Sequence, residues 1–391
     1  MLKAAALLLL PVALAAQEDT NKLLQNAAVL AAAGKYAQAE PILTRALAAE
    51  DAAPGPDHPL LIPILDALGS VRRAEGHAAE AETVYLRALK LLEKSDGDKS
   101  LSLIPHLKLL AGAYAALDRG VDAEMQLLRV LSIREKANGP NDLDLANDCA
   151  ELGGFYLSQK RYAVAEPNFR RAIGIVERKL GPEDAALIPL LDSLSDVFIK
   201  QKIFPPAEPP LRRIVWIQER AVGPADVKLA PHLDKLALLL FAESRFPEAE
   251  TLYRRSLAIW EPSMGPTNPS LTTALDNLAV SLAAQQKYAD SEPFYKRALA
   301  LREKATVENL NNFALVLEGA GDTTSAERQY TRAIAIAEKI PALPGAASVG
   351  ETELLAKTLD NYGSLLRKLK RDADAVKVEA RSKLLSKTAP Q

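Results

Sequence analysis

A single pattern returns along most of this chain at intervals of 42 residues. A glutamate occurs at each interval, and an arginine follows each glutamate five positions later. The glutamates are Glu40, Glu82, Glu124, Glu166, Glu208, Glu250 and Glu292, and the arginines are Arg45, Arg87, Arg129, Arg171, Arg213, Arg255 and Arg297. Self-similarity with a period of roughly 20 to 50 residues marks a chain built from one repeated supersecondary unit. The period therefore predicts an array of stacked repeats.

The period changes once and then recovers. The next pair, Glu327 and Arg332, comes 35 residues on, and Arg381 follows Arg332 by 49 residues, so the two steps together equal two normal periods. Connections absorb such changes at little cost, because loop-closure entropy depends only weakly on loop length. We therefore expect a trimmed turn around Lys304–Glu308 and a long inter-repeat loop near residues 341–353.

Each repeat reads as two amphipathic helices joined by a tight turn. Between Leu271 and Leu282 the leucines are spaced by four, three and four residues, which places them on one helical face. The pattern breaks at Gln285–Lys287 and resumes at Tyr288. Neither helix can bury its apolar face alone, so the repeats must stack on one another. No segment alternates in the manner of a β-strand, and we predict an all-α protein.

Small and large residues alternate between the two helices of a repeat. One column of equivalent positions is small: Ala27, Gly69, Ala111, Gly153, Ser195, Ala237, Ala279, Ala314 and Gly363. A second column is large: Leu43, Tyr85, Leu127, Phe169, Leu211, Tyr253, Tyr295 and Tyr330. We expect the small residues to let the helices of a pair approach closely. A glycine such as Gly139, usually followed by proline, is expected to close each second helix in the left-handed conformation.

These motifs carry a family resemblance. A small residue, then Gly-Lys-Tyr or a similar triplet, then Ala, Tyr or Phe, and Ala resembles the tetratricopeptide repeat. The 42-residue period and the Gly-Pro connections resemble the kinesin-light-chain type of that repeat. The resemblance covers about nine repeats, from about Asn21 to Ser386. It implies a right-handed superhelical solenoid forming a single domain over residues 17–391, with a C-terminal capping helix near 373–386.

The first sixteen residues resemble a secretory signal peptide. Lys3 supplies a positive start, Ala4–Ala16 is apolar, and Ala13-Leu14-Ala15 fits a cleavage site. We therefore predict a signal peptide over residues 1–16, export to the periplasm or the medium, and no stable membrane insertion after cleavage. An uncleaved N-terminal anchor or an apolar first helix is the alternative.

Little in the sequence points to chemistry. No metal-binding, phosphate-binding or nucleophile motif is present, and His106 and His232 lie three repeats apart. Cys149 occupies a position that holds leucine in other repeats, so we expect an inert core residue. A net charge of −2 gives no footprint for nucleic acid. We expect no catalysis, no cofactor and no metal.

The recurring Glu and Arg admit two interpretations. Residues five apart on a helix point in different directions, so the two side chains need not pair within one repeat. Each either bridges to a neighbouring repeat or is solvated, and exposed pairs contribute only about 0–1 kcal/mol.

The first helices carry the candidate binding residues. In arrays of this resemblance they line a concave groove that holds extended or helical peptides. One column there holds Asp66, Asp192, Asp234, Asp276 and Asp360, and the adjacent column holds Asn277, Asn312 and Asn361. Asparagine can both donate to and accept from a peptide backbone. A solvated polar face is the alternative. Lys108, Ala150, Lys235 and Glu151 interrupt the two columns, and bases such as Arg73 lie nearby, so the groove is not uniformly acidic.

The sequence therefore predicts a non-enzymatic scaffold that binds a peptide or protein partner in the groove. The alternative is a structural or assembly component of a cell-envelope complex that uses its outer face or its ends.

Overall fold

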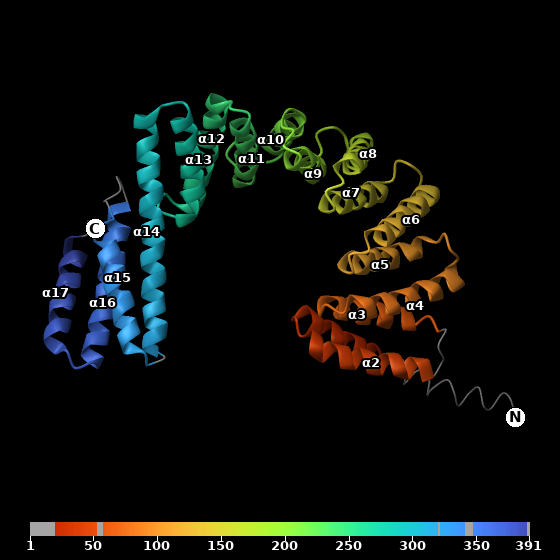
Figure 1. The fold of residues 1–391 in the computed structure, drawn as a ribbon, viewed down its shortest axis with the longest axis horizontal. Helices are drawn as coiled ribbons and strands as arrows, with labels where there is room; N and C mark the ends of the chain where they lie inside the picture. The colour runs from red at the N-terminus through yellow and green to blue at the C-terminus, as the bar shows by residue number, and fades with distance from the viewer. Residues whose placement is uncertain (1–19, 53–57, 320, 341–346, 389–391) are drawn as a thin grey trace. The chain divides into compact units, whose positions relative to one another are not determined.

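The computed structural model describes residues 20–52, 58–319, 321–340 and 347–388, and the predicted signal peptide lies outside these ranges. The described ranges consist of helices joined by short connections and carry no strand, as predicted (Figure 1). Residues 20–32 form the first helix. The helices that follow are α2 (Tyr36–Ala52), α3 (Leu61–Ala74), α4 (Ala78–Asp96), α5 (Ile104–Ala116), α6 (Gly120–Asn138), α7 (Leu143–Ser158), α8 (Tyr162–Leu180), α9 (Leu187–Lys200), α10 (Glu208–Val222), α11 (Ala230–Ala242), α12 (Phe246–Met264), α13 (Thr272–Ala284), α14 (Tyr288–Gly319), α15 (Thr323–Ala337), α16 (Ala347–Lys368) and α17 (Asp372–Thr388).

These helices form antiparallel pairs that follow the sequence period, nine of them within the described ranges. Repeat 2, for example, is α3 followed by α4, and repeat 9 is α16 followed by α17. Residues 1–201 and residues 202–391 form two compact units, called here the N-terminal unit and the C-terminal unit. The single continuous domain over residues 17–391 stays a prediction.

The two helices of a repeat pack large side chains onto small ones. A Cβ on Gly69 of α3 would lie 2.4 Å from Cε1 of Tyr85 on α4, and a Cβ on Gly153 of α7 would lie 3.1 Å from the Phe169 ring on α8. Both aromatic rings are buried. The close approach predicted from the small-residue column is therefore confirmed, because these rings occupy space that a larger residue would need.

Successive repeats pack on one another, and we call this contact the inter-repeat step. In this step the second helix of one repeat contacts both helices of the next repeat. Leu43 of repeat 1 shares one hydrophobic core cluster with Leu61, Leu65 and Leu68 of repeat 2. Since no repeat can bury its apolar faces alone, this step supplies the burial that holds the stack together.

Ion pairs accompany the same steps, and both members of the 42-residue pattern take part. Glutamates bridge to a base one repeat on: Glu82 to Arg119 at 2.8 Å, Glu208 to Arg245 at 2.6 Å, Glu250 to Lys287 at 2.9 Å and Glu327 to Arg371 at 2.7 Å. Arginines bridge back to an acid of the preceding second helix: Arg87 to Asp51, Arg129 to Glu93, Arg171 to Glu135, Arg255 to Glu219, Arg297 to Glu261 and Arg381 to Glu338. For these residues, bridging to a neighbouring repeat is the interpretation that holds.

The seventh and eighth repeats depart from the predicted pattern. The expected trimmed turn around Lys304–Glu308 is wrong, because α14 runs unbroken for 32 residues from Tyr288 to Gly319. In repeat 6 the second helix ends at Met264 and the next helix begins at Thr272. In repeat 7 the equivalent of Met264 is residue 306, which is 42 positions later. In repeat 8 the equivalent of Thr272 is residue 307, because seven residues have been lost between the two repeats. The seven lost residues therefore correspond to the whole connection. The second helix of repeat 7 and the first helix of repeat 8 are therefore fused.

The long inter-repeat loop is shorter than predicted. Residues 347–353 belong to α16 rather than to the loop near 341–353, and residues 341–346 lie outside the described ranges. Gly350 is the least favourable helix residue in that stretch, and a single glycine costs about 1 kcal/mol. The predicted capping helix near 373–386 corresponds to α17. No helix in the described ranges has the length and the apolar run needed to span a bilayer.

Gly139 closes α6 with φ 85° and ψ 172°. The positive φ was expected, but ψ is extended rather than left-handed helical. This region of backbone conformation is almost restricted to glycine, and a side chain there costs of order 1–3 kcal/mol.

We predict that Gly139→Ala lowers the free energy of unfolding by about 1–3 kcal/mol, because alanine is strained at this φ and ψ. Gly154→Ala is the matched control: its Cβ would meet nothing within 4 Å in the interior of α7. That control should gain roughly 0.5–1 kcal/mol. Denaturant titration followed by circular dichroism measures both, and equal midpoints for the two variants would contradict the conformational account.

Candidate functional site

A groove of about 520 Å³ crosses the first helices of three successive repeats in the N-terminal unit. Its apolar lining includes Pro105, Leu109 and Ala115 of α5, Leu127 of α6 and Phe155 of α7. Three charged residues share the lining: Arg73 of α3, Lys108 of α5 and Glu151 of α7. Lys108, Leu109 and Glu151 occupy the two columns predicted to face the groove. This part of the predicted surface is therefore hollow.

Arg73 enters the groove over a glycine. A Cβ on Gly112 of α5 would lie 2.7 Å from Nη1 of Arg73, so the absence of a side chain there lets the guanidinium approach the helix. Arg73 is exposed, its side chain hydrogen-bonds that of Tyr85, and no carboxylate of the described residues pairs with it. A guanidinium has five N–H donors, and its fork of donors suits the carboxylate of a ligand.

Lys108 is engaged within the protein. Its Nζ lies 2.7 Å from Oδ1 of Asp148 and 2.5 Å from Oε2 of Glu151. Burial disfavours the ammonium, but the two carboxylates outweigh that effect and hold the pKa of Lys108 above its ordinary value. Nε of Arg134 lies 2.9 Å from the other oxygen of Asp148, whose side chain is 1% exposed. Two cations therefore hold one buried carboxylate beneath the groove.

The predicted aspartates of the N-terminal unit are Asp66 and Asp192. Oδ2 of Asp66 lies 2.7 Å from Nε2 of His106. Burial favours the neutral imidazole, but Asp66 and the Ser102 carbonyl outweigh it and raise the pKa of His106. This contact stabilises the fold at acid pH, and its contribution falls as the pH rises through the pKa of the folded state. Asp192 is half-buried on α9.

In the C-terminal unit two predicted aspartates also have partners within the chain. Oδ2 of Asp234 accepts a hydrogen bond from the Trp260 indole at 3.1 Å, and burial raises the pKa of Asp234. Arg302 of α14 pairs with Asp276 of α13. These carboxylates tie the first helix of a repeat to its own second helix.

The remaining predicted residues form no single ladder. Asn361 donates from Nδ2 to Oδ1 of Asn311 at 2.9 Å, and Asn311 is buried, whereas Asn312 is exposed. Asn277 is half-buried and Asp360 is exposed. The eight residues divide between the two units, and their role in binding a partner stays a prediction.

Sequence reasoning missed Phe155 as a lining residue. The equivalent positions hold Val71, Ala113, Val197 and Leu239, so an aromatic ring in that column was a signal. The predicted Asp and Asn columns consist of residues that recur along the chain, whereas this groove depends on residues that do not recur.

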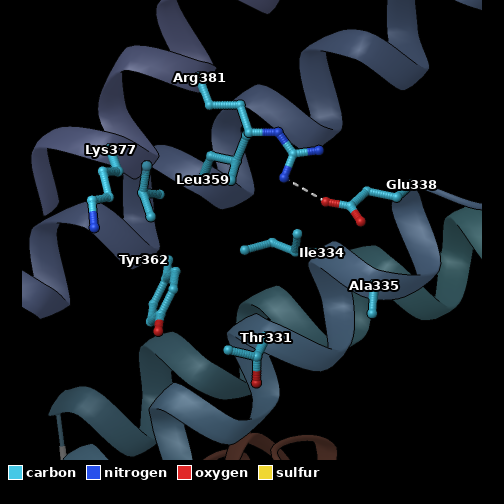
Figure 2. Close-up of a pocket in the computed structure, with 9 residues that line it drawn as sticks. Thr331, Ile334, Ala335, Glu338, Leu359, Tyr362, Lys377 and Arg381 are labelled. Carbon is cyan, nitrogen blue, oxygen red and sulfur yellow. Dashed lines mark ion pairs between the residues drawn. The ribbon is translucent and has the colours of Figure 1, made fainter. Parts of the chain in front are cut away.

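A second hollow of about 400 Å³ lies in the C-terminal unit between α15, α16 and α17. Figure 2 shows Thr331, Ile334 and Glu338 on one side and Arg381 on the other, with the ion pair of Arg381 and Glu338 across it at 2.6 Å. This pair belongs to the inter-repeat step, so the hollow is part of the packing between repeats 8 and 9.

Reactive groups are scarce. Burial raises the pKa of the Cys149 thiol to about 11, so the thiolate is a minor species at neutral pH. Among the described residues, no three side chains of His, Cys, Asp or Glu are placed to share a metal ion.

Models of a known repeat match three parts of the chain. Models of the tetratricopeptide repeat match residues 19–94, 149–186 and 229–304. No curated protein matches the sequence.

Several solved structures are similar to this chain. BtubC (BKLC) from P. vanneervenii is 19% identical, with 58% of this chain and 90% of that chain covered and a TM-score of 0.47. A putative kinesin light chain with nearly identical TPR-like repeats from Podosopora anserina is 19% identical, with coverage of 53% and 99% and a TM-score of 0.47. Aspartyl phosphate phosphatase F from Bacillus subtilis is 13% identical, with coverage of 94% and 94% and a TM-score of 0.45.

The buried charge beneath the groove gives a prediction. Lys108→Ala combined with Arg134→Ala should lower the free energy of unfolding by about 3–5 kcal/mol, because Asp148 is left as an uncompensated buried charge. Asp148→Leu should stay within about 1 kcal/mol of the wild type, since leucine fits this column and the cations keep Glu151 and Asp144 as partners. Denaturation midpoints compare the two. A larger loss in Asp148→Leu than in the double variant would contradict this assignment.

Proposed function

The chain is a tetratricopeptide repeat protein whose 42-residue repeats resemble those of kinesin light chains, and we propose that it is a non-enzymatic scaffold that binds a segment of a partner protein in the groove of α3, α5 and α7. Repeats of this kind generally serve as surfaces for protein partners. The observation that carries the proposal is the position of Arg73, a guanidinium without a carboxylate partner at the edge of an apolar groove.

The lining suggests what the segment carries. Phe155, Leu109 and Leu127 offer an apolar floor that suits a bulky aliphatic or aromatic side chain. Arg73 suits a carboxylate one or two residues away from that side chain. Lys108 and Glu151 neutralise one another and so favour no net charge at their end of the groove.

A second candidate function uses the outer face. Val121, Met125 and Leu128 of α6 are exposed and spaced by four and three residues, so they form one apolar stripe on a second helix. Such a stripe favours an assembly component that docks through its outer face. Export by the predicted signal peptide would place either function in the cell envelope or outside the cell, and sequencing the mature N-terminus tests that.

The groove is tested with a peptide library displayed on phage, selected against the wild-type protein. We expect selected peptides to pair an acidic residue with a bulky apolar one. Arg73→Glu and Phe155→Ala should each weaken binding of those peptides about tenfold or more, as expected for groups at the centre of an interface.

Lys90→Glu is the charge-matched control, because Lys90 is exposed on the second helix α4 outside the groove. It should leave the affinity within about twofold, in line with the near-neutral residues around a hot spot. Equal binding by wild type, Arg73→Glu and Phe155→Ala would exclude the groove. Loss of binding in a Val121→Ser, Met125→Gln, Leu128→Gln variant instead would favour the outer face.

A further inference from the structure

Three side chains on α14 are exposed at positions that are core elsewhere. Tyr295 is 41% exposed, whereas its equivalents Tyr85, Phe169, Tyr253 and Tyr330 are at most 2% exposed. Leu299 is 54% exposed, against 6% for its equivalent Leu257. Phe313 is 51% exposed, against 0% for its equivalent Leu278. A stable fold rarely presents core positions to water without a reason.

These positions meet one another at other inter-repeat steps. Leu43 and Leu68, the equivalents of Tyr295 and Phe313 in repeats 1 and 2, share one core cluster. Tyr330 and Tyr362, their equivalents in repeats 8 and 9, lie ring against ring with centroids 6.0 Å apart. Tyr295 and Phe313 are therefore the two halves of the contact that would join repeat 7 to repeat 8.

The ion pair of the same step is also missing. The arginine of repeat 8 is Arg332, and its equivalents Arg297 and Arg381 pair with Glu261 and Glu338. The acid expected for Arg332 is Glu303. Neither Arg332 nor Glu303 has an ion pair with any other residue in the parts of the chain that the structure describes.

The fused helix explains why the chain cannot make this step itself. Packing of repeat 8 on repeat 7 requires the chain to reverse between Tyr295 and Phe313, and the connection that reverses it is absent. A helix of 32 residues is roughly 48 Å long. Figure 1 shows α13 beside one half of α14, and α15 and α16 beside the other half. Since Tyr295 and Phe313 sit in opposite halves of one straight helix, they are held apart.

We propose that a second copy of this chain covers these surfaces, with the α14 helices of the two copies antiparallel. Repeat 7 of each copy stacks on repeat 8 of the other, because each offers what the regular step needs. Tyr295 and Leu299 of one copy meet Phe313 of its partner, and Glu303 of one copy pairs with Arg332 of its partner. A two-fold axis that crosses α14 near Lys304, midway between Tyr295 and Phe313, makes every contact twice and closes the assembly.

Antiparallel packing is what the regular step already uses, since a second helix and the next first helix run in opposite directions. Exchange of identical elements between copies is a low-cost route to a dimer when a connection is too short to fold back. The dimer thus contains two regular inter-repeat steps, each between repeat 7 of one copy and repeat 8 of the other, and it needs no new kind of contact.

One contact of the regular step changes. Glu250 pairs with Lys287 in the preceding step, but their equivalents Glu292 and Asp322 are both acidic. Each has a partner already: Lys296 pairs with Glu292 at 2.7 Å, and Asp322 accepts from the Ser325 amide at 3.1 Å. This exposed acidic pair costs little, and salt screens its repulsion.

Size-exclusion chromatography with light scattering tests the proposal on the full chain. The wild type should have twice the mass of the 42.2 kDa chain. Tyr295→Ser with Phe313→Ser should give a monomer with unchanged helix content, because both residues are exposed in the isolated chain. Leu238→Ser, which also alters an exposed apolar residue of this unit, should remain a dimer. A monomeric wild type, or a dimer that survives the double substitution, would overturn the proposal.

Two further variants keep the test decisive if the double substitution fails to fold. Inserting a copy of Gly265–Leu271 between Thr306 and Val307 restores the missing connection and should produce a monomer. Glu303→Arg should weaken the dimer about tenfold, because it places two arginines together, and adding Arg332→Glu should restore the dimer. A tenfold change in affinity corresponds to about 1.4 kcal/mol, which is close to the low end of the coupling energies of close charge pairs across interfaces. Failure of the charge swap to rescue, or a dimer that persists after the insertion, would show that another surface joins the copies. Neither result depends on whether the groove binds a peptide.

Discussion

The contact between one repeat and the next is the interaction on which the rest of this structure depends. Within a repeat, two helices bring a large side chain such as Tyr85 against a small one such as Gly69, but each pair still has an uncovered face. The following repeat covers that face and adds ion pairs at its edge. Stability in such arrays is approximately the sum of the intrinsic stabilities of the repeats and of these nearest-neighbour contacts.

The same dependence explains both surfaces to which function is assigned. The groove of α3, α5 and α7 exists because three first helices are held side by side, and the buried carboxylate of Asp148 ties two of those repeats together through Lys108 and Arg134. The exposed face of α14 exists because one step is left unmade within the chain. We propose that a peptide binds in the groove formed by the stacked repeats. We propose that a second copy of the chain supplies the contact between repeats 7 and 8 that one chain cannot make.

The repeat period was sufficient to predict much of this fold. It placed Cys149 in the core and paired the small column with the large one, because these features depend only on positions that recur. It did not predict the fused helix. A missing loop and a shortened loop look alike in sequence spacing, and the difference depends on whether residues 303–308, Glu-Lys-Ala-Thr-Val-Glu, continue a helix. Nothing in that stretch is Gly or Pro, so local propensity favours continuation.

The candidate site was harder to predict. The aspartate and asparagine columns were visible, but their side chains reach partners that no column comparison reveals: Asp66 reaches His106, Asp234 reaches Trp260, and Asn361 reaches Asn311. Conversely, Arg73 depends on the absence of a side chain at Gly112, and Phe155 has no aromatic equivalent in the neighbouring repeats. Pairing across repeats, rather than residue type, decides which polar groups remain available to a ligand.

The central claim is that loss of one connection fuses two helices and leaves one inter-repeat step open. Amide hydrogen exchange, read by mass spectrometry over residues 300–312, tests it most directly. A continuous α14 predicts slow exchange across Lys304–Glu308, in contrast to fast exchange in an ordinary connection such as Gly139–Asp142. Exchange across Lys304–Glu308 as fast as in Gly139–Asp142 would mean that a turn is present, and would contradict the account.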